Sequence, residues 1–184
     1  MSDEIHTLNQ VGVRLVQEKT LLSEQSLNSP ELLAQFVSDV IKDYDREVMC
    51  VVSLDAKLHP LNMSICSMGA LDRTIAAPRE VMKTVLLSNA NGFVLFHNHP
   101  SGLCSPSLED VRTTDMMSKV GELLGIPLLD HIIVGAHSDE IYSFYQMEAL
   151  PKDRLTYARD VADIKLRFRD GEEKVTEYQK QLHL

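Results

Sequence analysis

Long hydrophobic runs are missing from this sequence. The longest apolar stretches, Val48–Leu54 and Phe93–Phe96, fall far short of the ~20 residues that a helix needs to span a bilayer. The first ten residues, MSDEIHTLNQ, have neither the basic start nor the apolar segment of an export signal. We therefore expect a cytoplasmic protein with no membrane partner.

Cysteine and aromatic residues are also scarce. Three cysteines (Cys50, Cys66 and Cys104) form no CxxC pair, which argues against a disulfide framework or a cysteine-rich zinc site. This usage fits a reducing compartment. Tryptophan is absent, aromatic residues make up 5% of the chain, and no basic run is interleaved with aromatic residues as in a nucleic-acid-binding patch.

Positive charge is in short supply over most of the chain. Residues 1–150 hold 10 basic and 20 acidic side chains, a balance of −10, whereas residues 151–184 hold 8 basic and 7 acidic ones. Non-specific affinity for DNA comes mostly from basic side chains that neutralise phosphates. We therefore expect DNA binding to be weak or indirect, and to collapse between low and physiological salt.

The residues that are present predict a globular α/β protein. Apolar residues make up 44% and charged residues 24% of the 184 positions, which suits one domain with a short appendage. Alternation, helical periodicity and capping residues predict strands at 11–17, 47–55, 59–68, 92–97, 128–134 and 141–146, and helices at 29–43, 78–89 and 107–125. Strands that alternate with helices, together with adjacent hairpins, indicate a mixed sheet with helices on its faces.

Pro151 marks a predicted domain boundary. Residues 1–150 form the domain, and residues 151–184 form a charged C-terminal extension. The apolar positions of this extension fit a helix, although 164–168 also alternate as a strand would. We favour the helix.

One polar segment carries the residues for metal chemistry. His97 and His99 lie two positions apart at the end of a predicted strand, so both imidazoles can point to the same side. Asp110, in the first turn of the next helix, can return as a third ligand. Two histidines and one carboxylate leave a fourth tetrahedral position open, which is typical of a catalytic zinc site.

Other interpretations of these residues remain open. Ser107-x-x-Asp110 is also the pattern of a helix capping box, which needs no metal. Cys104 is either a soft metal ligand or a residue that packs the loop, and packing is the favoured alternative. Asp130 and His131 either orient a metal ligand by hydrogen bonding to it, without contacting the metal, or pack in the core.

The motif His97-x-His99, followed by Ser107-x-x-Asp110, resembles the signature of the JAMM/MPN metalloproteases. The fuller string HNHPSG…PS…D looks like the bacterial RadC branch of that family. Arg46-Glu47, Gly69, Pro78-Arg79-Glu80-Val81 and Leu129-Asp130-His131-Ile132-Ile133-Val134-Gly135 extend the resemblance over residues 11–147. The helix-hairpin-helix module that usually precedes this domain in RadC proteins has no match here, and neither has the segment after Pro151.

The resemblance implies a fold and an activity. The fold is the JAMM/MPN type, a curved mixed sheet with flanking helices and a cytidine-deaminase-like layering. The activity is zinc-dependent hydrolysis of a peptide or isopeptide bond, and ubiquitin-like or sulfur-carrier-like proteins are the suggested substrates. Glu47 matches the general acid/base that takes a proton from the zinc-bound water. Ser107 matches the serine that stabilises the developing oxyanion.

Two alternative functions follow from the same resemblance. One is a role in DNA repair or recombination, which is the function named for the RadC branch. The net negative charge of residues 1–150 and the missing helix-hairpin-helix module argue against this role. A catalytically silent MPN scaffold that binds a partner is the other alternative. Scaffold members usually lose metal ligands, whereas Glu47, His97, His99 and Asp110 are all present here. The oligomeric state does not follow from the sequence.

Overall fold

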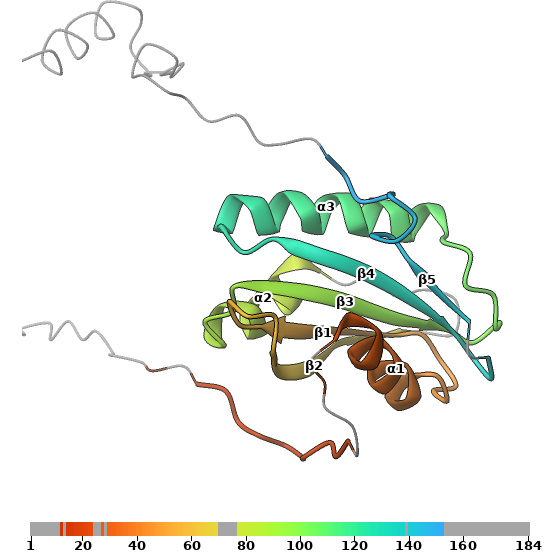
Figure 1. Cartoon of the computed structure of the whole chain (residues 1–184), viewed down its shortest axis with the longest axis horizontal. Helices are drawn as coiled ribbons and strands as arrows, with labels where there is room; N and C mark the ends of the chain where they lie inside the picture. The colour runs from red at the N-terminus through yellow and green to blue at the C-terminus, as the bar shows by residue number, and fades with distance from the viewer. Residues whose placement is uncertain are drawn as a thin grey trace, which may run out of the picture. The chain divides into compact units, whose positions relative to one another are not determined.

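The computed structural model describes residues 12, 14–23, 27, 29–69, 77–138 and 140–152. Within these ranges the chain forms helices α1 (Pro30–Ile41), α2 (Pro78–Leu87) and α3 (Leu108–Leu124), and strands β1 (Val48–Leu54), β2 (Pro60–Met68), β3 (Gly92–His99), β4 (Leu128–Gly135) and β5 (Ile141–Ser143) (Figure 1). Each of these elements overlaps a segment that the sequence pattern predicts.

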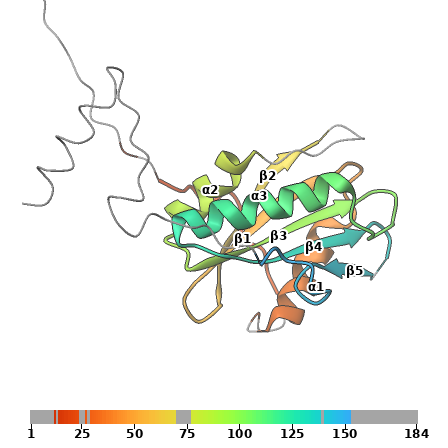
Figure 2. The same cartoon turned by 90° about the horizontal axis from the view of Figure 1, so that it is seen from above.

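The five strands form one mixed sheet in the order β2-β1-β3-β4-β5. Strands β3 and β4 are parallel, and the other neighbouring pairs are antiparallel. Figure 2 shows α2 and α3 on one face of this sheet and α1 on the opposite face. The predicted α/β class, with a mixed sheet and flanking helices, is confirmed.

Each face of the sheet has its own hydrophobic core. Even-numbered positions of β1, such as Cys50 and Val52, pack with α1, whereas odd-numbered positions, such as Met49 and Val51, pack with α2 and α3. Side chains alternate between the two faces along a strand. All seven residues of β1 are buried, because this central strand is covered on both faces.

The predicted ends of α1 and α3 are confirmed. The Ser29 side chain accepts a hydrogen bond from the amide of Leu32, and Pro30 occupies the first helical position. Ser107 caps α3, and Gly125 ends it with a left-handed φ of 69°, a conformation that glycine adopts without strain.

The predicted strand at 11–17 is wrong. Its described residues, 12 and 14–17, lie in no strand, while Val11 and Val13 fall outside the described residues. Leu15 and Val16 are 44% and 76% exposed. A strand is stable only when its backbone groups pair with a neighbour, and alternation in the sequence does not supply one.

The last strand is shorter than the predicted 141–146. Strand β5 ends at Ser143, because the following residues form a turn. Asp130 on β4 accepts hydrogen bonds from the Ser143 hydroxyl (2.6 Å) and from the Tyr145 amide (2.9 Å). This long-range contact, which no local pattern encodes, ends the strand.

The predicted helix in the extension 151–184 lies outside the described residues beyond Lys152, and it stays a prediction. Among the described helices, none is both long and apolar enough to cross a membrane.

Candidate metal centre

Strand β3 places both histidines of the motif on one face of the sheet. The strand continues through His99, two residues beyond the predicted end. His97 and His99 share the odd-numbered face of β3 with Phe93 and Leu95, which pack with α2 and α3. His97 is 1% exposed, and His99 lies at the partly open end of the strand. Their Nε2 atoms are 2.9 Å apart.

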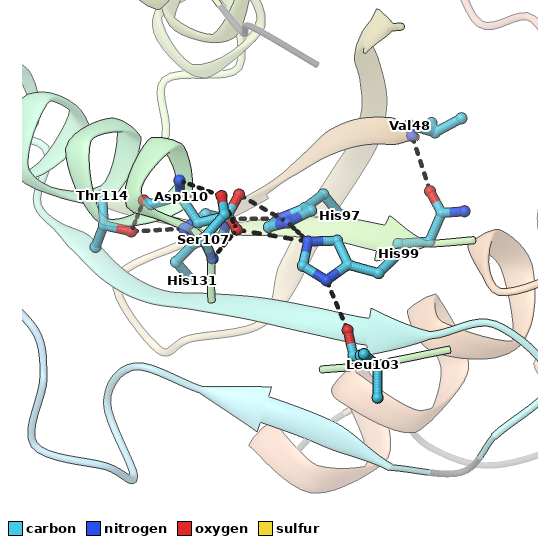
Figure 3. A network of polar contacts seen from close by, with 9 residues as sticks. Val48, His97, His99, Leu103, Ser107, Asp110, Thr114 and His131 are labelled. Atoms are coloured by element: carbon cyan, nitrogen blue, oxygen red, sulfur yellow. Dashed lines mark hydrogen bonds and ion pairs between the residues drawn. The ribbon is translucent and has the colours of Figure 1, made fainter. Parts of the chain in front are cut away.

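The first turn of α3 brings a carboxylate to the two rings. Asp110 Oδ1 lies 3.0 Å from His97 Nε2, and Asp110 Oδ2 lies 3.5 Å from His99 Nε2 (Figure 3). Among the described residues, these three form the group of potential ligands that could hold a metal ion. Electron-rich atoms thus surround one point, and a bound cation would stabilise that arrangement.

Asp110 also completes a helix cap. The amide and the hydroxyl of Ser107 each donate to Asp110 Oδ2 at 2.7 Å, and the Asp110 amide donates to Ser107 Oγ at 3.2 Å. The capping box is therefore present, and the same carboxylate also faces the histidines. Because the Ser107 hydroxyl donates to Asp110 here, its role at an oxyanion stays a prediction.

The electrostatics of the cluster depend on its burial. Burial acts to raise the pKa of the Asp110 carboxyl, but hydrogen bonds from His97 and His99 outweigh it and hold that pKa well below its usual range. The hydrogen bond to Asp110 raises the pKa of His99. Burial, followed by repulsion from His97, lowers the pKa of His131, so this ring stays neutral.

Glu47 lies at the same end of the sheet. Strands β1 and β3 pair as far as Met49 opposite His97, and Glu47 lies two residues before Met49. Glu47 shares the odd-numbered face of β1, and its charge contributes to the raised pKa of His99. The glutamate singled out by the family resemblance is therefore close to the candidate ligands.

Asn98 has a structural role that the sequence analysis missed. Its side chain, fully buried on the opposite face from the histidines, accepts a hydrogen bond from the Val48 amide at 2.8 Å. It also donates to the carbonyl oxygens of Tyr44 (3.3 Å) and Arg46 (3.1 Å). These contacts hold the backbone on both sides of Glu47 against the strand that carries the candidate ligands.

Comparison with known protein families agrees with this arrangement. A model of the RadC-like JAB domain matches residues 27–150. The chain belongs to the RadC-like JAB domain family. The resemblance identified from the sequence is confirmed, and the five-stranded mixed sheet with three helices fits the JAB/MPN fold.

Several bacterial proteins are similar to this RadC-like domain. A UPF0758 protein of Desulfitobacterium hafniense is 39% identical over 132 residues, which cover 72% of this chain and 58% of the relative. A UPF0758 protein of Shouchella clausii is 39% identical over 66% of this chain and 53% of its own length. A UPF0758 protein of Thermotoga maritima is 35% identical over 68% of this chain and 55% of its own length. The chain spans a little over half the length of these relatives.

Cys104 and Asp130 lie outside the ligand cluster of the RadC-like domain. The Cys104 thiol donates to the Glu140 carbonyl oxygen at 2.9 Å, and it therefore packs the loop against the segment before β5. Asp130 binds the turn after β5. Its neighbour His131 instead contacts His97, so the two residues of the predicted pair have separate roles.

A close backbone approach holds the loop between β3 and α3. A Cβ atom added at Gly135 would lie 2.5 Å from the Gly102 carbonyl oxygen and 3.0 Å from Cys104 Sγ. We expect Gly135→Ala to lower the free energy of unfolding by ~1–3 kcal/mol, as overpacking does, and to weaken metal binding. Denaturant titration measures the first effect. Gly12→Ala, whose Cβ meets nothing within 4 Å, is the control; equal stability of the two variants would contradict this account.

Proposed function

We propose that this RadC-like domain is a zinc-dependent hydrolase that cleaves a peptide or isopeptide bond. The convergence of His97, His99 and Asp110 carries the proposal, because two imidazoles and one carboxylate are the protein ligands of many catalytic zinc sites. This donor set leaves one coordination position open. Zinc, when bound, supplies Lewis acidity toward a water molecule and a substrate carbonyl group.

The surrounding residues supply the proton chemistry in this proposal. Glu47, whose charge acts on His99, accepts a proton from the attacking water and then delivers it to the leaving amine. Ser107, next to Asp110, is the candidate donor to the developing oxyanion if its hydroxyl turns away from the carboxylate. The net charge of −10 over residues 1–150 favours a protein or peptide substrate over a nucleic acid, because it repels the phosphate backbone.

Metal analysis of the purified full chain tests the site. We expect about one zinc per chain, and we expect the double variant His97→Ala/His99→Ala to lose it, since only one ligand remains. Elemental analysis after gel filtration gives the stoichiometry. Full zinc retention in the double variant would refute the assignment of the site.

Asp110→Asn separates the ligand role from the capping role. Asparagine keeps an oxygen that accepts the Ser107 amide, so we expect α3 and the fold to persist while zinc affinity falls. Circular dichroism reports the fold and chelator competition reports the affinity. Normal zinc affinity in a folded variant would show that Asp110 only caps the helix.

A chelator-sensitive activity screen tests the reaction itself. The panel contains linear and isopeptide-linked fusions of ubiquitin-like and sulfur-carrier-like proteins. Cleavage that stops with a chelator and returns with zinc supports the proposal. Cleavage that continues in the His97→Ala/His99→Ala variant would come from a contaminant or from another site.

A further inference from the structure

A buried row of polar side chains leads away from His97 on the side opposite to the candidate metal position. Thr114 on α3 and His131 on β4 are 1% and 0% exposed. Figure 3 shows both side chains to one side of His97, with Thr114 on α3. Buried polar groups are costly unless they are paired, so the partners of these atoms determine what the row can do.

Every polar atom of the row has a partner within hydrogen-bond distance. Thr114 Oγ1 lies 2.7 Å from the Asp110 carbonyl oxygen and 2.7 Å from His131 Nδ1. His131 Nε2 lies 2.8 Å from His97 Nδ1. We call Thr114, His131 and His97 the buried relay.

A cation bound at His97 Nε2 would fix the direction of each bond. The one proton of the neutral His97 ring is then on Nδ1 and is donated to His131 Nε2. His131 in turn donates from Nδ1–H to Thr114 Oγ1, and the Thr114 hydroxyl donates to the Asp110 carbonyl oxygen, which only accepts.

His99 reaches the same state by a separate route. Its Nδ1 lies 2.7 Å from the Leu103 carbonyl oxygen, which can only accept. Nδ1 therefore carries a proton, and a bound cation would take the place of the contact between Nε2 and Asp110. Because this bond involves only the loop backbone, His99 provides an internal reference that changes in the buried relay should not affect.

We infer that Thr114 and His131 are positioning residues of the metal centre, which stabilise the Nδ1–H tautomer that His97 must adopt to bind a metal through Nε2. The inference rests on the metal site of the proposed function. Without the Thr114 hydroxyl, His131 loses its acceptor at Nδ1. Its proton then moves to Nε2 and is donated to His97 Nδ1, which shifts the His97 proton onto the nitrogen that should bind zinc.

The plane of the His131 ring is also fixed. Phe144 stacks on it with ring centres 5.2 Å apart and an angle of 8° between the planes. Asp130 holds the turn that carries Phe144, through the Ser143 hydroxyl and the Tyr145 amide. Two neighbouring residues of β4 therefore have complementary roles. His131 forms the hydrogen bond to His97, and Asp130 holds the turn whose Phe144 stacks on the His131 ring.

Thr114→Val removes the hydroxyl at nearly constant volume, and Thr114→Ser restores it. Residues that orient metal-bound histidines typically change metal affinity by ~10–100-fold. We expect Thr114→Val to weaken zinc binding to the full chain within that range, and Thr114→Ser to stay within about threefold of the wild type. Thr113→Val, on the same helix and outside the relay, is the control. Competition with a chromophoric chelator measures the affinities.

Long-range ¹⁵N NMR of the zinc-loaded full chain reads the tautomers directly. We expect Nδ1–H for His97, His99 and His131 in the wild type, because zinc occupies Nε2 of both ligands and His97 then donates to His131 Nε2. His131→Phe, which retains stacking on Phe144, should also lose zinc affinity.

Two results would overturn the inference. One is an Nε2–H tautomer of His131 in the zinc-loaded wild type, and the other is wild-type zinc affinity in a folded Thr114→Val variant. If the wild type binds no zinc, the proposed function fails too, whereas unchanged zinc affinity in Thr114→Val beside a zinc-binding wild type refutes the inference alone.

Discussion

Replacing Glu47 with glutamine is expected to lower the rate of amide-bond hydrolysis by ~10²–10⁴-fold while the zinc content stays at the wild-type level. Glutamine keeps the volume and one acceptor oxygen, but it cannot take a proton from water. Three other residues supply the candidate ligands, so removing the Glu47 charge leaves the metal site complete. Steady-state rates with a cleaved substrate from the screening panel, paired with elemental analysis, measure both effects.

Glu109→Gln is the matched control for that experiment. Glu109 lies in the first turn of α3 beside Asp110, and its side chain is 67% exposed. It carries the same negative charge as Glu47 near the site, but it is not one of the candidate metal ligands. A Glu47→Gln variant that loses zinc would make Glu47 a ligand, and one that turns over at the wild-type rate would refute the proposed mechanism.

Asn98→Ala is expected to have the second large effect. The variant leaves the Val48 amide and the carbonyl oxygens of Tyr44 and Arg46 without their buried partner. At ~1 kcal/mol for each hydrogen bond, the free energy of unfolding should fall by about 3 kcal/mol. Denaturant titration measures this loss. Asn91→Ala, at an exposed position just before β3, should change stability by less than ~0.5 kcal/mol.

The same substitution should also affect catalysis through Glu47. Once its backbone is released, Glu47 no longer faces His99 in a fixed position, and misplacement of a general base lowers the rate. A double variant with Glu47→Gln should then be no slower than Glu47→Gln alone, because the base is already absent. Fully additive rate losses would show that Asn98 affects catalysis by another route.

Local chemistry in the sequence was sufficient for most of the secondary structure. Ser29 followed by Pro30, and Ser107 followed three residues later by Asp110, are start signals whose partners lie within one helical turn. Gly125 works in the same local way at the end of α3. The exceptions, which are the strand at 11–17 and the ends of β3 and β5, depend on whether a distant chain segment is available to pair.

The supporting residues of the site were harder to predict. Thr114 lies one helical turn after Asp110, so its place behind that ligand follows from helical geometry once Asp110 is known. Asn98 alternates with the histidines and therefore had to lie on the opposite face of the strand. In both cases the position was predictable, whereas the bonding partner was not.

The sequence by itself determined the α/β class, the family and the residue types of the candidate metal centre, because these depend on spacing along one chain segment. The tertiary structure alone decided the pairings across the sheet. The register of β1 against β3 places Met49 opposite His97 and brings the charge of Glu47 near His99, and β4 beside β3 places His131 in contact with His97. A shift of one residue in either register would turn these side chains to the other face. That register is set by the packing of two cores, which no local motif contains.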